Sequence, residues 1–272
     1  MQLKNDPPQA SRRTLGDVLY AGTSQPVVSE SDWAALVQAM ALGGGQALKA
    51  LYKRTHRLVF TLLVRITGNR QLAEELMLDT FCDAWRQSSR FDPANATVLG
   101  WVMNLARAAA IDRLRFDYRD VFKGELAALH RVLGASNSWT TDILRPAASV
   151  QRRLAERIGA KTPDEPLPQM PPWSEPEWTK VAPRIACKLL ATDAPAHRVS
   201  MLVRLAPEGE YPPHTHSGVE ELHLLDGELW IDERKLYPGD YNRAESGTGD
   251  QHVWSETGCT CVLITSTRDV LR

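Results

Sequence analysis

Three histidines and one glutamate in the last third of the chain have the types and spacing of metal ligands. His214 and His216 are two residues apart, so on a β-strand both imidazoles leave the same face. Glu220 follows four residues later, after a flexible Ser-Gly pair, and a later strand can bring His252 to the same point. Three imidazole nitrogens and a carboxylate suit Zn, Fe, Mn or Ni and leave room for water. The alternative is that the histidine pair lies on a solvated strand without a metal.

The stretch that contains these residues reads LVRLAPEGEYPPHTHSGVEELHLLDGELW, followed by LYPGDY. It resembles the cupin superfamily, and is most similar to the cupin domain of ChrR-type anti-sigma factors, over about residues 173–267. The resemblance implies a small β-barrel (a double-stranded β-helix) that binds one divalent metal, zinc in ChrR-type proteins, and receives a signal. Two departures concern shared substrate chemistry rather than the metal ligands. The usual Pro before His252 is absent, and Glu256 replaces an expected Asn.

The first half of the chain predicts four amphipathic helices. Apolar residues recur at intervals of three and four from about Trp33, and again from about Gln46 until Gly68-Asn69 ends the second helix. The third helix is QLAEELMLDTFCDAWRQ, which Phe91-Asp92-Pro93 terminates, and the fourth is TVLGWVMNLARAAAIDRLR. These helices predict an all-α bundle, and a bundle without any nucleic-acid partner is the alternative to the family resemblance described next.

Three segments carry a resemblance to region 2 of sigma-70-family factors, in particular the extracytoplasmic-function group. They read ALKALYKRTHRLVFTLLVRITGN, AEELMLDTFCDAW and RFDPANATVLGWVMNLARAAAIDRLR, and together cover about residues 46–116. Two positions depart from the family: Leu78 stands where Gln is usual, and Ala108 where Asn is usual. A complete sigma factor also carries a second DNA-reading domain with a helix-turn-helix, and the sequence shows no such pattern.

The resemblance implies two interaction surfaces on these helices. The residues that correspond to the surface docking on the clamp of the RNA polymerase core are Glu74, Glu75, Asp79 and Phe81. The segment from residue 90 to 115 corresponds to the part that melts and reads the −10 promoter element, where basic residues hold single-stranded DNA and pockets or stacking surfaces receive flipped bases. The predicted DNA-binding residues are Arg90, Asn95, Thr97, Arg107, Arg113 and Arg115.

Composition is that of an ordinary globular protein with an uneven distribution of charge. Of 272 residues, 43% are hydrophobic and 24% charged, and no apolar run is long enough to span a membrane. The N-terminus lacks an apolar signal core, so we expect a cytoplasmic protein whose four scattered cysteines are reduced. Residues 1–161 carry 22 Lys and Arg against 15 Asp and Glu, whereas the remainder carries 10 against 18. This asymmetry predicts a polyanionic partner for the first half, or contact between the two halves.

The predicted fold class is α + β with two domains. Residues 1–30 are expected to form a flexible arm, 31–120 the sigma region 2-like bundle, 121–172 a helical and Pro-rich linker, and 173–272 the cupin barrel. The leading hypothesis is a non-enzymatic transcription regulator, in which a cupin sensor of a small molecule or oxidative signal controls the sigma-like, DNA-binding domain. The alternatives are a metal-dependent cupin dioxygenase with a scaffold helical domain, and an interaction protein that mimics the sigma domain and titrates a partner.

Overall fold

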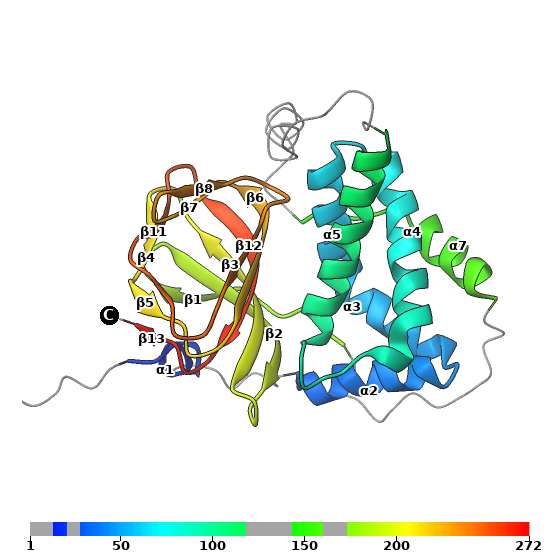
Figure 1. Ribbon diagram of the computed structural model, residues 1–272, viewed down its shortest axis with the longest axis horizontal. Helices are drawn as coiled ribbons and strands as arrows, with labels where there is room; N and C mark the ends of the chain where they lie inside the picture. The colour runs from blue at the N-terminus through cyan, green and yellow to red at the C-terminus, as the bar shows by residue number, and fades with distance from the viewer. Residues whose placement is uncertain (1–12, 21–27, 118–142, 160–172, 272) are drawn as a thin grey trace, which may run out of the picture.

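The computed structural model describes residues 13–20, 28–117, 143–159 and 173–271. Figure 1 shows a group of helices from the first half of the chain beside a β-barrel from the second half. The fold class predicted from the sequence, an all-α domain followed by an all-β cupin barrel, is therefore confirmed. None of the helices in the described part of the chain is long and apolar enough to cross a membrane.

The helices begin and end where the sequence supplies caps. The Ser29 side chain accepts a hydrogen bond from the Ser31 N–H at the start of helix α2, and the Asn69 side chain accepts one from the Leu72 N–H at the start of helix α4. Gly68 ends the third helix in the left-handed conformation, at φ 64°. The bounds are α1 (Leu15–Tyr20), α2 (Glu30–Ala41), α3 (Gly45–Thr67), α4 (Arg70–Gln87), the 3-10 helix η1 (Ser88–Arg90), α5 (Val98–Asp117) and α7 (Ser149–Ile158).

Helix α3 lies at the centre of the helical domain. Its side chains at Val59, Phe60, Leu62 and Leu63 have no exposed surface, and α2, α4 and α5 all pack against it. Full burial of side chains of this size stabilises the fold by about 1.5–3 kcal/mol each. The wide apolar surface of α3 follows from its sequence, in which apolar residues are almost continuous from residue 58 to 66.

The barrel consists of antiparallel strands in three sheets. The six-stranded sheet has the order β1-β2-β3-β12-β6-β9, and the two smaller sheets have the orders β10-β5-β13 and β4-β11-β7-β8. The strands are β1 (Thr179–Ala182), β2 (Ile185–Asp193), β3 (Arg198–Leu205), β4 (Gly209–Tyr211), β5 (His214–Thr215), β6 (Glu220–Gly227), β7 (Leu229–Ile231), β8 (Arg234–Leu236), β9 (Tyr241–Ala244), β10 (Gly249–Asp250), β11 (Val253–Ser255), β12 (Cys259–Ser266) and β13 (Val270–Leu271).

The six-stranded sheet is buried on both faces. Side chains such as Leu222 and Leu224 of β6 pack in the barrel interior, whereas Leu225, the next residue, belongs to the hydrophobic core of the helical domain. Leu202 of β3 and Val262 of β12 join that same core. Because strand side chains alternate between faces, one sheet serves as the wall of the barrel and as the floor under the helices.

Polar contacts fasten the helices to the sheet. The buried guanidinium of Arg65 in α3 donates from Nε to the Leu225 carbonyl at 2.9 Å and from Nη2 to Asp226 at 2.6 Å. Arg198 of β3 donates to the Pro93 carbonyl, in the loop before α5, at 2.7 Å. The backbone of α3 also approaches the barrel closely, since a Cβ added to Gly239 would lie 2.9 Å from Ile66 Cγ1.

Residues 13–20 correct the prediction of a flexible N-terminal arm. They include helix α1, whose Leu15 and Leu19 are buried in the barrel core. The Leu15 N–H donates to the Asp269 carbonyl at 2.9 Å, and the Leu271 N–H donates to the Arg13 carbonyl at 3.0 Å. The two leucines are four residues apart and therefore lie on one face of the helix. Their burial in the barrel core holds this short helix in place.

Helix α7 lies in the range 121–172, for which the sequence predicts a helical and Pro-rich linker. Residues 121–142 and 160–172 of that range lie outside the described residues.

Replacing Arg65 by Ala should destabilise the protein by about 3 kcal/mol, because it leaves a partly buried carboxylate without its partner. Equilibrium unfolding in urea measures the change. Arg86→Ala is the matched control, since Arg86 makes an exposed ion pair with Asp83 within α4 and should cost less than about 1 kcal/mol. Equal losses in the two variants would contradict this account of the interface.

Glu30 should make stability depend on pH. Burial raises its pKa from 4.5 to about 7, although the Val98 N–H and Arg198 oppose the shift. The folded protein therefore binds this proton more tightly than the unfolded chain, and stability is lost as pH rises from 4.5 through 7. The free energy of unfolding of the wild type relative to Glu30→Gln should fall by about 3 kcal/mol between pH 4 and 8. Urea titrations at each pH measure the difference, and a constant value would refute the prediction.

Candidate metal centre

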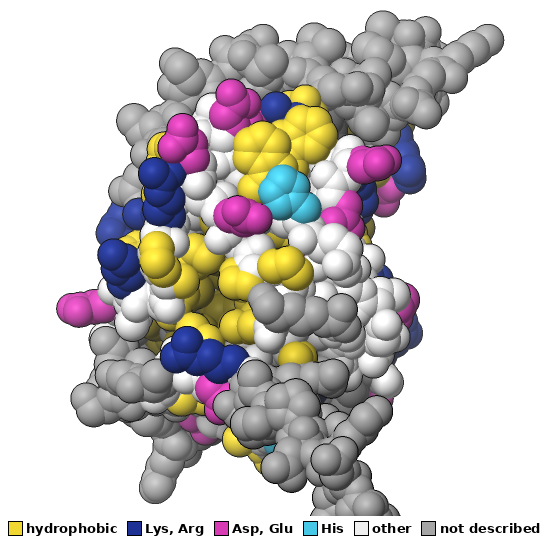
Figure 2. Space-filling model, turned by 90° about the vertical axis from the view of Figure 1, so that its left-hand side faces the viewer, with side chains coloured by type: hydrophobic (Ala, Val, Ile, Leu, Met, Phe, Trp, Pro, Cys, Tyr) yellow, Lys and Arg dark blue, Asp and Glu magenta, His cyan; other side chains and the backbone are white. Residues whose placement is uncertain are grey.

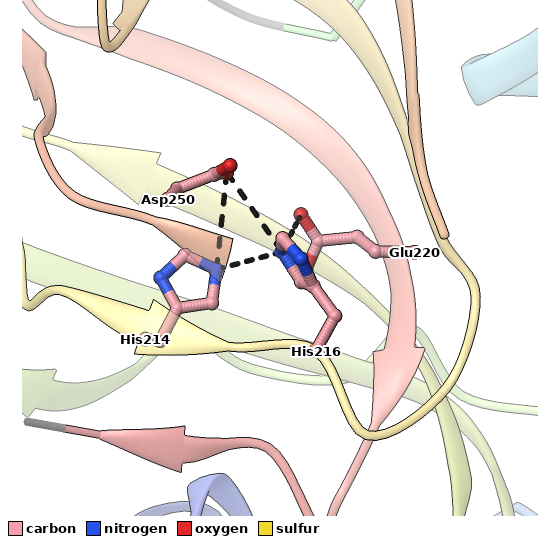
Figure 3. A group of neighbouring side chains, drawn as sticks. All are labelled: His214, His216, Glu220 and Asp250. Carbon is pink, nitrogen blue, oxygen red and sulfur yellow. Dashed lines mark hydrogen bonds and ion pairs between the residues drawn. The ribbon is translucent and has the colours of Figure 1, made fainter. Parts of the chain in front are cut away.

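Four side chains from three strand segments converge inside the barrel, near one end (Figure 3). His214 begins β5, His216 follows it, Glu220 begins β6 and Asp250 ends β10. One donor atom from each of the four can be chosen so that all lie within 4.8 Å of one another. His214, His216 and Glu220, three of the four residues predicted as ligands, thus lie close together, and Asp250 lies with them.

The distances fit donors around a single ion. The Nε2 atoms of His214 and His216 are 3.1 Å apart, and His216 Nε2 lies 3.7 Å from Glu220 Oε1. Asp250 Oδ2 is 3.8 Å from His216 Nε2 and 4.0 Å from His214 Nε2. Donors bound about 2.0–2.2 Å from one metal lie roughly 3–4 Å from each other, so the cluster needs little adjustment to hold one.

Outer hydrogen bonds fix the orientation of both imidazoles. His214 Nδ1 lies 3.2 Å from the Pro212 carbonyl, which can only accept. His216 Nδ1 lies 3.0 Å from Thr248 Oγ1, and that hydroxyl donates its own proton to the Glu245 carbonyl at 2.7 Å. Both Nδ1 atoms therefore carry a proton, and neutral rings turn two Nε2 lone pairs toward each other. Two lone pairs that face each other are stabilised by a cation or a proton between them. Metal-binding histidines usually donate the N–H of their other ring nitrogen to an acceptor, as both rings do here.

The surroundings are acidic and buried. Burial lowers the pKa of His216, but Glu220 and the neighbouring Asp250 and Asp269 outweigh it, so the net shift is upward. Burial raises the pKa of Asp250, against the opposing effect of the two histidines. A divalent cation would relieve the crowding of these carboxylates, and the residues present fit such an ion.

Asp269 holds the loop that carries His216 in place. Its carboxylate accepts the Ser217 N–H at 2.6 Å and the Thr265 hydroxyl at 2.5 Å. Through Asp269, these two bonds connect the loop to Thr265 near the end of β12, so the cluster is tied to the six-stranded sheet.

His252 does not lie with the other predicted ligands. Its side chain is 52% exposed, and its Nε2 is 3.6 Å from Glu210 on the outer surface. The ring stacks on Trp254, which stacks in turn on Trp230. The expected position of a third imidazole is occupied by the Asp250 carboxylate instead.

A bend explains this correction. Asp232 Oδ1 accepts the N–H groups of both Gln251 and His252 at 2.9 Å, which breaks the strand between β10 and β11. In β11, Val253 is buried in the barrel core and Trp254 points outward, so His252 shares the outward face with Trp254. The alternation of Val253, Trp254 and Ser255 was the sequence signal for this orientation.

An apolar cavity of about 40 Å³ adjoins the cluster. His214, Glu220 and Asp250 line one side, and most of the other lining residues are aliphatic. Its volume admits a few water molecules or a small ligand. On the same side of the molecule, Figure 2 shows a hollowed area lined by hydrophobic side chains.

The predicted DNA-binding residues are divided between surface and interior. Arg90, Asn95, Arg113 and Arg115 are exposed. Thr97 is 3% exposed, and its hydroxyl accepts the Gly100 N–H at the start of α5, so it supports the helix rather than facing solvent.

The sixth residue of that set, Arg107, is turned toward the barrel. Its guanidinium lies over the Tyr241 ring of β9, 5.3 Å from the centroid.

The predicted polymerase-binding residues lie on α4, but only Glu75 is fully exposed. Phe81 has no exposed surface and belongs to the helical core. Glu74 accepts the Ala147 N–H at 3.2 Å, and Asp79 forms a 2.7 Å ion pair with Arg157 of α7.

Comparison with known families places a match on each domain. Residues 172–268 match the family described as ChrR Cupin-like domain, and residues 51–119 match Sigma-70 region 2. Both matches coincide with the domains seen in the structure.

The similar curated proteins are sigma factors. The chain is 32% identical over 102 residues to the ECF RNA polymerase sigma factor SigK of Mycolicibacterium vanbaalenii, which covers 38% of this chain and 52% of that protein. It is 27% identical over 146 residues to the SigK of Mycobacterium bovis, covering 49% of this chain and 78% of the relative. The chain thus spans about half the length of the first relative.

Solved structures of cupin proteins are similar to about a third of this chain. An RmlC-like cupin protein of Ralstonia eutropha aligns with a TM-score of 0.32 and 17% identity, over 34% of this chain and 63% of that chain. An acetylacetone dioxygenase of Acinetobacter johnsonii aligns with a TM-score of 0.30 and 14% identity, over 36% and 78%.

If the four-residue cluster holds a divalent metal, Asp250→Ala should weaken the binding of added Zn²⁺ by about 100-fold, because losing a direct ligand costs at least as much as losing an outer partner. His252→Ala is the matched control and should leave affinity unchanged, since that ring lies outside the cluster. Calorimetric titration and metal content after dialysis measure both. Loss of zinc in the His252 variant with retention in the Asp250 variant would contradict this assignment.

Proposed function

We propose that this chain, whose residues 51–119 match Sigma-70 region 2 and whose residues 172–268 match the ChrR Cupin-like domain, is a transcription regulator. On this proposal its cupin metal centre controls how the sigma-like helices engage RNA polymerase and promoter DNA. The proposed metal is zinc, held by His214, His216, Glu220 and Asp250. Zinc would cross-link the strands that carry these ligands without undergoing redox chemistry. The observation that carries the proposal is the direct connection through β6 between this cluster and α5.

Neighbouring residues of β6 face the two domains. Glu220 points into the barrel and belongs to the metal cluster. Glu221 points to the helices, where its Oε1 accepts Asn104 Nδ2 of α5 at 3.0 Å and the Tyr241 hydroxyl at 2.7 Å. A shift of the first carboxylate toward a metal therefore acts on the backbone that positions the second.

Helix α5 lies directly on this part of the sheet. A Cβ added to Gly100 would come within 3.0 Å of Ile264 Cδ1 and 3.2 Å of Glu221 Oε2, so side chains of β12 and β6 pack directly against the backbone of the helix. About two turns further along α5, Arg107 lies over Tyr241. The helix expected to read the promoter thus has one side covered by the barrel, and a movement of β6 changes what that side can contact.

The exposed basic residues supply the other half of the proposed activity. Arg90, Asn95, Arg113 and Arg115 are exposed, and on this proposal they contact a single-stranded −10 element, the arginines through its phosphates. Contacts of this kind are strongly salt-dependent. The proposed place of action is the cytoplasm, and on this proposal the chain is not an enzyme.

The cavity beside the cluster favours a second candidate, a metal-dependent cupin dioxygenase for which the helices are a scaffold. Oxygen consumption by the iron-loaded protein with small diketones or phenolics tests it. Turnover that survives disruption of α5 would favour this candidate over the regulator.

The proposed function is tested by capture of bacterial core RNA polymerase on the purified full-length protein, with and without a zinc chelator. Removal of the metal should change the amount of bound polymerase by about tenfold, a typical coupling between two sites. Glu221→Ala should retain zinc but lose this response, because it removes the contact from β6 to α5. The matched control is Glu233→Ala, at an exposed position outside the interface.

Two results would count against the proposal. Absence of polymerase binding with and without metal would exclude the regulator. If the wild type binds the same amount of polymerase with and without metal, polymerase is still the partner, but the cupin metal centre does not control its binding.

A further inference from the structure

Residues 143–158, here called the α7 segment, cover one face of helix α4. Glu74 accepts the Ala147 N–H, and Asp79, five residues later in α4, pairs with Arg157 at the other end of the segment. A third contact joins Arg70 to the Arg145 carbonyl. The segment thus follows α4 over at least two of its turns, as Figure 1 shows for α7 itself.

Two further hydrogen bonds fix the start of the α7 segment on α3. The Leu144 N–H donates to Thr61 Oγ1 at 2.9 Å, and Arg57 donates to the Ile143 carbonyl at 2.9 Å.

Helix α7 is amphipathic and buries its apolar side. Val150 has no exposed surface and Leu154 has 3%, and both belong to the core of the helical domain. These residues are four apart and share one face. Arg152, Arg153 and Glu156 are exposed. The α7 segment is therefore a short basic helix whose apolar face completes the core.

The covered face of α4 is the one expected to dock on polymerase. Of the four residues that the family resemblance assigns to this contact, Glu74 and Asp79 bind the α7 segment. Leu78, one turn after Glu74, is 4% exposed and stands where sigma factors usually carry a polar Gln. A leucine at this position suits an apolar cover better than an aqueous or polar docking surface.

We propose that this acidic face of α4 is a docking surface for a basic amphipathic helix, that the α7 segment occupies it in the free protein, and that core RNA polymerase binds there only after the segment leaves. The proposal rests on the proposed function, since it takes polymerase as the partner. It adds a point of control separate from the metal centre: in Figure 1, α7 lies on the side of the helical domain away from the barrel.

The contacts of α7 are suited to reversible release. The Asp79–Arg157 pair is 43% and 46% exposed, so it holds the helix only weakly. No side chain caps the first turn of α7, where Ala148 is the N-cap residue. A helix of ten residues is marginal once it leaves its apolar support.

A native thiol reports on the cover. Cys82 lies three residues after Asp79 and is 3% exposed. Burial raises the pKa of its thiol, and the charge of Arg157 in α7 opposes that shift. The other three cysteines are buried in the barrel core, so labelling of Cys82 by a thiol reagent reports on this face of the helical domain.

The test uses the full-length protein with Leu154→Asp, which removes the apolar anchor, and Arg157→Glu, which sets two acidic groups against each other. Arg152→Glu is the matched control, because Arg152 is exposed and pairs with Glu156 inside α7. We expect Cys82 to be labelled at least about tenfold faster in Leu154→Asp and to a smaller extent in Arg157→Glu. Core polymerase should bind Leu154→Asp about tenfold more tightly than it binds the wild type, and Arg157→Glu should show a smaller gain. The affinity of the Arg152→Glu control should equal that of the wild type.

Three outcomes of this experiment would count against the inference. Faster labelling of Cys82 with polymerase affinity equal to that of the wild type overturns the inference and leaves the proposed function intact. Polymerase binding by none of the proteins overturns the proposed function and this inference with it. Labelling that stays slow in the double variant Leu154→Asp/Arg157→Glu shows that α7 does not shield the face, and also overturns the inference.

Discussion

The structure depends on a six-stranded sheet that must be covered on both faces. Its inner face closes the barrel, and its outer face, with Leu202, Leu225 and Val262, is apolar and completes the helical core. Burial of apolar area is the main favourable term in folding, so exposing this outer face by separating the domains would be costly. The helices and the barrel therefore pack as one unit, and strand β6 carries Glu220 of the candidate metal cluster on one face and the helix contact Glu221 on the other.

Polar groups at this boundary make the arrangement specific. Arg65 satisfies a backbone carbonyl and a carboxylate of the barrel from inside the helical core. His223 of β6 is fully buried, and neither ring nitrogen has a hydrogen-bond partner among the described residues. Burial, aided by the charge of Arg107, lowers the pKa of His223 to about 3, so this ring is neutral near pH 7. A neutral ring between sheet and helix packs as a hydrophobic group, whereas a charged one would push the two layers apart.

The sequence predicted the elements well and the orientation of single side chains less well. Caps and breakers such as Gly68 and Asn69 determine helix ends locally, and the His214–Glu220 motif is compact enough for spacing to determine its geometry. Asp250 faces the cluster although His252, two residues later, faces outward, because Asp232 imposes a bend from another turn. The alternation of Val253, Trp254 and Ser255 indicates the orientation of His252 but does not reveal that of Asp250. Resemblance to a family also transfers residue types without their burial, which is why Phe81 and Thr97 proved to be core residues. Coverage of Glu74 and Asp79 by α7 is a tertiary contact that no local pattern encodes.

Hydrogen exchange of the full-length protein, with zinc bound and after chelation, tests most directly the central claim that the metal cluster and the helices are coupled through β6. The account predicts that removing zinc speeds amide exchange in β6 (Glu220–Gly227) and in the first half of α5 (Val98–Asp117), with α7 unaffected. Exchange that changes only in the loops and strands around His214 and Asp250, with α5 unchanged, would contradict it. In that case the two domains would pack against each other, but metal binding would not affect the helices.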